Sequence, residues 1–226
     1  MDAEMEGIFD RCNELTQELT REYQKSAERG KVTERAKNLF HEVLVKIRSA
    51  LDIAMNRVFN KHTLLTANKK AKMEREAGFP ICELSREFHD RMRRLGLSGL
   101  QHSNARLYEK LRQSQPFSSE NQGLLLLRDL SNLGKHVGLA PQRCRLDKAK
   151  QITGPKGTLA IFTGGAGPVG PDGKPISPAP DWDVRDIMLA TFEVNHSSGR
   201  IRWPDFLCLS FCQETRHYIA QLLKLL

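Results

Sequence analysis

The sequence lacks the long apolar runs of a membrane protein and the cysteine density of a disulfide scaffold. Its run Leu124–Leu127 is far shorter than the ~18 residues of a membrane helix. Residues 1–6 are acidic and do not resemble a signal peptide. The five cysteines form an odd, scattered set, which predicts reduced thiols: Cys12, Cys82, Cys144, Cys208 and Cys212. We therefore expect a cytoplasmic protein that does not enter a membrane.

Several motifs that mark catalytic or cofactor sites are also missing. The glycine cluster 164–167 lacks the Gly-Lys-Ser/Thr ending of a phosphate loop, so we interpret it as a hairpin connection. No serine or cysteine lies in a nucleophile elbow. Cys208, Cys212 and His217 have a spacing that can bind zinc, but no second Cys or His pair accompanies them. Buried thiols are the preferred interpretation, and no metal or cofactor is predicted.

What the chain does have is an excess of positive charge. Its formal net charge is +8, and lysines and arginines crowd residues 61–75. Such an excess favours phosphate backbones and other acidic ligands. A solvated surface that only aids solubility is the alternative interpretation, and charge by itself does not separate the two.

Hydrophobic periodicity predicts a mainly α fold. Helical spacing indicates about five helices in a bundle over residues 1–140, at 3–29, 34–60, 85–95, 103–113 and 124–138. Glycine and proline then become frequent, with strand-like runs at 158–163 and 187–194 and a final helix from about Asp205. Residues 206–211 fit either a strand or a helix. We expect residues 141–226 to form a small strand-containing addition whose final helix packs on the bundle.

Two of the predicted helices carry polar residues beside a strong apolar face. On the second helix, Arg48 and Asp52 are four residues apart and can pair. On the helix 124–138, the polar residues are Arg128, Asn132, Lys135 and His136. The other six histidines lie in contexts that suggest no catalytic role: His41, His62, His89, His102, His196 and His217.

If the two helices pack together, their polar edges meet. An imidazole at His136 can then exchange a proton at a ribose 2′-hydroxyl or a leaving oxygen, while Arg48 or Lys135 stabilises charge on the phosphate. Such a cluster supports RNA cleavage without a metal. In the alternative interpretation, His136 and Asn132 cap their helix and the Arg48–Asp52 pair is a structural brace. The protein is then a non-enzymatic interaction module.

Three segments resemble a known group of sequences. Lys46–Asp52 reads KIRSALD, Gly78–Ile81 reads GFPI and Leu130–His136 reads LSNLGKH. In order and spacing they resemble uncharacterised bacterial helical proteins that carry an L-R-S-A-L-D-H helix, an F-P-I entry and an L-x-N-x-D-K-H-R segment. The resemblance covers about residues 39–140. This sequence departs from the pattern at Ile53, Gly134 and Val137.

That group is similar to HEPN-like helical domains, which include metal-independent ribonucleases of toxin–antitoxin and antiphage defence systems. The resemblance implies a helical bundle, an RNA ligand, a homodimer or an antitoxin-like protein partner, and a site on these helices. Its catalytic residues would be His136, Arg48 and Lys135, and its substrate contacts Asp52, Asn132 and Arg128. HEPN nucleases place an arginine a few residues before a histidine, whereas seven residues separate Arg128 from His136 here.

Overall fold

The computed structural model describes residues 2–118, 122–136, 139, 141–153, 159–163, 183–196, 199–202 and 204–226. Within them the chain is mainly helical with one small antiparallel sheet, as the sequence predicts. The helices are α1 (Ala3–Glu28), α2 (Glu34–His62), α3 (Ala67–Glu74), α4 (Ser85–Arg94), α5 (Leu100–Ser103), α6 (Ala105–Gln113), α7 (Gln122–His136) and α8 (Pro204–Leu223). The strands are β1 (Gln142–Thr153), β2 (Leu159–Thr163), β3 (Asp183–His196) and β4 (Gly199–Arg202).

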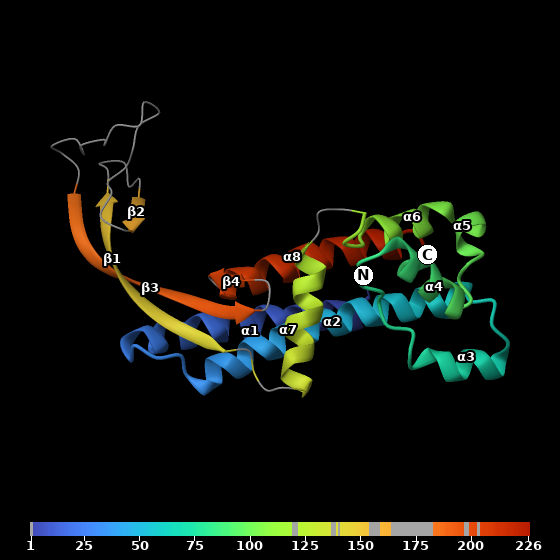
Figure 1. Cartoon of the computed structure of the whole chain (residues 1–226), viewed down its shortest axis with the longest axis horizontal. Helices are drawn as coiled ribbons and strands as arrows, with labels where there is room; N and C mark the ends of the chain where they lie inside the picture. The colour runs from blue at the N-terminus through green and yellow to red at the C-terminus, as the bar shows by residue number, and fades with distance from the viewer. Residues whose placement is uncertain are drawn as a thin grey trace, which may run out of the picture.

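Three long helices, α1, α2 and α8, lie side by side and form the body of the molecule (Figure 1). A glycine and a threonine shape the turn between α1 and α2. Gly30 has φ +62°, which favours glycine after a helix end, and Thr33 accepts a hydrogen bond from the Ala36 N–H at 3.1 Å. The apolar stripes of all three helices are buried, and Ile47, Leu51 and Ile219 are at most 1% exposed.

Helix α7 crosses α2 steeply, and α3 to α6 gather at the end of α2 that is far from the sheet (Figure 1). Seven helices precede residue 140 in the described part of the chain, so the prediction of about five was too low. The additional ones are α3 and α5, of eight and four residues. Helix α3 buries no residue, so no apolar stripe marked it, and α5 is one turn before the cap at Asn104.

The strands form a sheet in the order β2-β1-β3-β4, and β1 and β3 make a long ribbon that projects from the bundle (Figure 1). At its base the Tyr23 ring of α1 stacks on Phe192 with centroids 4.3 Å apart. The Tyr23 hydroxyl donates to Gln142 Oε1 at 2.9 Å. The ribbon therefore starts from a buried aromatic contact on α1.

Sequence patterns did not predict strands β1 and β4, and they did not decide between strand and helix for residues 206–211. Strand β1 has no run of β-branched residues and β4 has only four residues, and both exist through their pairing with β3. Residues 206–211 belong to α8 and are helical. Helix α8 packs on α1 and α2, while the division of the chain near residue 140 stays a prediction. The glycine cluster 164–167, predicted to connect a hairpin, lies outside the described residues.

No helix within the described ranges combines the length and the apolar character that a membrane span requires.

Candidate functional site: an arginine pocket between α2 and α7

Packing of α7 across α2 brings together four of the six predicted site residues. They line a pocket of about 400 Å³ that we call the arginine pocket, whose walls include Arg48, Asp52, Phe79, Arg91, Arg128 and Asn132. Helix α2 supplies Arg48 and Asp52, and α7 supplies Arg128 and Asn132. The predicted meeting of the two polar helix edges is therefore observed for these four side chains.

Arg48 and Asp52 each form a hydrogen bond with the backbone of Phe79, and we call this pair of contacts the grip on Phe79. The Phe79 N–H donates to Asp52 Oδ1 at 2.8 Å, and Arg48 Nη2 donates to the Phe79 carbonyl oxygen at 2.7 Å. The two side chains also pair with each other, with Nη2 and Oδ1 3.1 Å apart. One helical turn of α2 thus satisfies both polar groups of a buried backbone unit, which fixes the segment that follows α3.

Gly78 permits this grip. A Cβ atom at residue 78 would stand 3.0 Å from Asp52 Oδ1 and 3.4 Å from its Cγ. A side chain there would press on the carboxylate that holds Phe79. The KIRSALD and GFPI segments that stand out in the sequence are therefore two halves of one contact.

The pocket has more positive than negative side chains, with three arginines and one aspartate among the described residues that line it. The Arg48 side chain is 21% exposed, and its Nη1 atom is buried without a hydrogen-bond partner among the described residues. Burial lowers the pKa of Arg91, and the positive charges of Arg94 and Arg48 lower it further. The Arg91 guanidinium is held by a hydrogen bond from Nη2 to the Glu76 carbonyl oxygen. Two half-buried cations that repel each other make this pocket favourable for an anion.

Arg128 contributes less to this excess of positive charge. Its guanidinium pairs with Glu83 at 2.9 Å and with Asp129 at 2.8 Å. Burial opposes the charged form, but these hydrogen bonds outweigh burial and raise the pKa of Arg128. Asn132 is exposed at the pocket wall and can offer an amide to a ligand.

The remaining two predicted catalytic residues are only partly described. Lys135 and His136 belong to the last turn of α7, but their side chains lie outside the described part of the structure. The assignment of Lys135 and His136 as catalytic residues stays a prediction.

The Asp52 oxygens accept hydrogen bonds from Phe79 and Arg48, so the carboxylate acts as an acceptor that shapes the pocket.

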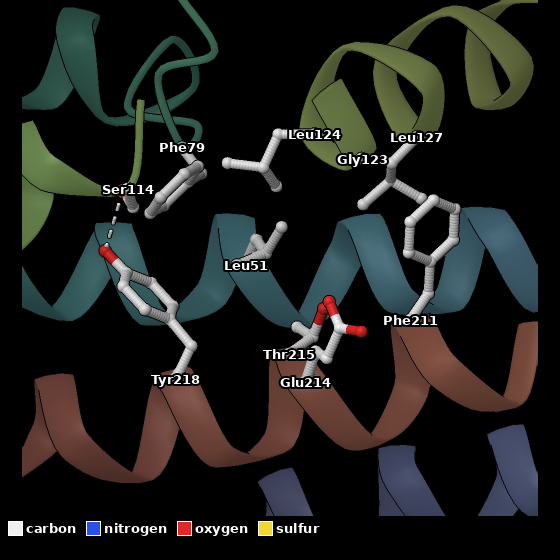
Figure 2. Close-up of a pocket in the computed structure, with 10 residues that line it drawn as sticks. All are labelled: Leu51, Phe79, Ser114, Gly123, Leu124, Leu127, Phe211, Glu214, Thr215 and Tyr218. Atoms are coloured by element: carbon white, nitrogen blue, oxygen red, sulfur yellow. Dashed lines mark hydrogen bonds between the residues drawn. The ribbon is translucent and has the colours of Figure 1, made fainter. Parts of the chain in front are cut away.

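A smaller apolar pocket of about 80 Å³ adjoins the arginine pocket, and Phe79 lines both. Figure 2 shows the Phe79 ring beside Leu124 and above Leu51 of α2. On the same side of the pocket, the Tyr218 hydroxyl, on α8, donates to Ser114 Oγ at 3.2 Å. Phe79 is therefore both the residue whose backbone is gripped and the wall between a polar and an apolar space.

The predicted interpretation of the cysteines on α8 is confirmed. Cys208 is 0% exposed and Cys212 is 2% exposed, and the Cys212 thiol donates to Asn13 Oδ1 at 3.6 Å. Burial raises the pKa of Cys208 well above its ordinary value. His217 is exposed and lies against Gln221. Across the described ranges, no three His, Cys, Asp or Glu side chains are grouped closely enough to hold a metal.

Among the described residues that line the pocket, Arg91 is the charged one that the sequence analysis did not select. It lies on α4 together with three other arginines, Arg86, Arg93 and Arg94. A signal was present, because Phe88, Met92 and Leu95 are buried and Arg91 lies three residues after Phe88, beside that apolar stripe. Burial of this apolar stripe therefore brings the neighbouring Arg91 side chain close to the core.

Comparison of the chain with protein-family models, with curated proteins and with solved structures gave no match.

Proposed function

We propose that the chain is a HEPN-like protein that binds RNA or another nucleotide-bearing ligand, with a phosphate group in the arginine pocket. The observation that supports it is the buried Nη1 of Arg48, which has no hydrogen-bond partner among the described residues, together with the half-buried Arg91 in the same pocket. An anionic oxygen there would accept charge-assisted hydrogen bonds, which are worth about twice a neutral one. Phosphate offers several such oxygens, and Asn132, which lines the pocket, would contact a sugar or base.

The proposal extends to metal-independent cleavage through His136. In that reaction the imidazole would exchange a proton at the 2′-hydroxyl or at the leaving oxygen, and Arg48 or Lys135 would stabilise the charge that develops on phosphorus. A labelled RNA incubated with the protein in EDTA tests this step. We expect cleavage by the wild type and none by His136→Ala at unchanged RNA affinity. Intact RNA in both reactions would reduce the proposal to binding.

Binding itself is tested with a matched pair of variants on α4. Arg91 lines the pocket, whereas Arg93 is 75% exposed on its side chain and pairs with Asp90 outside it. Loss of a charged hydrogen bond costs about 1.5–3 kcal/mol, or roughly 10- to 100-fold in affinity. We expect Arg91→Gln to weaken the binding of fluorescein-labelled RNA by this factor and Arg93→Gln to leave it within about twofold.

The second candidate is an interaction module in which the polar cluster is structural. It is favoured by the grip of Arg48 and Asp52 on the Phe79 backbone, which would stabilise the fold without any ligand. In that case the wild type does not bind RNA or mononucleotides. Arg48→Gln would then lower the unfolding free energy. Any effect of Arg91→Gln would likewise be limited to the unfolding free energy.

A further inference from the structure

Helix α3 presents positive charge that the fold itself does not use. It has no buried residue, and its basic residues are fully or partly exposed. Lys69, Lys72 and Arg75 follow one another at three-residue steps, and within the described ranges none of their side chains makes a hydrogen bond or an ion pair. A helix held in place without an apolar stripe, and with unpaired cations on its side, is shaped for contact with something else.

A short stretch of chain connects these basic residues to the arginine pocket. Arg75 directly follows α3, and the next residue, Glu76, accepts the hydrogen bond from Arg91 through its carbonyl oxygen. Gly78 then lies against Asp52, and Phe79 lines the pocket. From Lys69 to Arg75 the helix rises about 9 Å, at about 1.5 Å per residue. The unpaired charges therefore continue over a length greater than one phosphate group.

We propose that the ligand is a single-stranded RNA of several nucleotides, with one phosphate in the arginine pocket and the adjoining chain along α3. This inference rests on the proposed function and narrows its ligand from any nucleotide-bearing molecule to a polynucleotide. A pocket of about 400 Å³ has room for about one nucleotide. A duplex holds its phosphates on the outside of a stiff rod, whereas an unpaired strand can bend one phosphate inward.

The test compares three probes by fluorescence anisotropy: a labelled twelve-nucleotide oligouridylate, a labelled duplex of the same length, and unlabelled uridine monophosphate as competitor. The variant is Lys69→Gln/Lys72→Gln/Arg75→Gln, whose glutamines keep the helix propensity of the lysines. Its control is Arg21→Gln/Arg29→Gln/Lys31→Gln, which removes the same charge from exposed positions at the far end of α1.

We expect the α3 variant to bind the single strand at least about 10-fold more weakly than the wild type. The slope of log K against log salt should fall by about 2, since each neutralised phosphate of a single strand contributes about 0.7. Competition by the monophosphate should not change, and the α1 control should retain the wild-type slope. The duplex should bind more weakly than the single strand.

Three outcomes would overturn the inference while the proposed function stands. They are equal weakening by the α1 control, competition by the monophosphate at the affinity of the oligonucleotide, and tighter binding of the duplex. Failure of the wild type to bind any of the probes would instead remove the proposed function, and with it this inference.

Discussion

Truncation of Asp52 tests whether the grip on Phe79 holds the pocket together. In Asp52→Ala the Phe79 N–H loses its acceptor at 2.8 Å, and Phe79 is 2% exposed, so water does not easily replace the carboxylate. Arg48 also loses the partner at 3.1 Å that keeps its guanidinium on the Phe79 carbonyl. Asp52→Asn is the matched control, because an amide oxygen can still accept the N–H while the charge is removed.

The expected magnitudes separate the two variants. A buried donor left without an acceptor costs about 1–3 kcal/mol. The ion pair contributes only about 0.2–1 kcal/mol, because the Asp52 side chain is 40% exposed. We therefore expect Asp52→Ala to lower the unfolding free energy by about 2–3 kcal/mol and Asp52→Asn by about 1 kcal/mol or less. Urea unfolding followed by circular dichroism measures both, with the m-value as a check that the folded state is unchanged.

Asp52→Asn also has an expected effect on binding. It removes the only acidic side chain among the described residues that line the arginine pocket, so the affinity for uridine monophosphate should rise. The reasoning is refuted if Asp52→Ala is within about 0.5 kcal/mol of the wild type, or if the two variants are equally destabilised. Either result would mean that the contact with Phe79 contributes nothing measurable.

Three further perturbations probe the surroundings of the site. Phe79→Ala should lower the unfolding free energy by about 3–5 kcal/mol, because it removes the buried ring that lines both pockets and leaves a cavity. Urea titration measures this loss, and a loss below about 1 kcal/mol would contradict a role of Phe79 in the core. Tyr23→Phe should cost about 1–2 kcal/mol, because it leaves the buried Gln142 amide without its donor, and hydrogen exchange should accelerate at residues 142–144; unchanged exchange would argue against an anchored ribbon. Burial raises the pKa of Tyr218 above its ordinary value of 10.0, so the unfolded state loses this proton first and stability should fall as pH rises above about 10. Tyr218→Phe should flatten that fall in thermal melts between pH 9 and 11, and identical pH profiles would show that Tyr218 is not responsible.

The amino-acid sequence by itself determined the helical framework. Apolar residues at helical spacing gave α1, α2, α4, α6 and α7, and local chemistry gave the ends, as at Gly30 and Thr33. These features depend on residues within one or two turns of each other, which is why a pattern in the chain is sufficient. The pairing of Arg48 with Asp52 was predictable for the same reason.

Only the tertiary structure decided what that pair does and which cations join it. The Phe79 backbone, 27 residues beyond Asp52, meets α2 because α3 and its connection bring the chain back, and Arg91 arrives from α4. Strand β1 likewise exists because β3 lies beside it, 30 or more residues later in the chain. Hydrogen bonds, ion pairs and burial between such distant segments are set by the packing of the whole chain, and no local spacing encodes them.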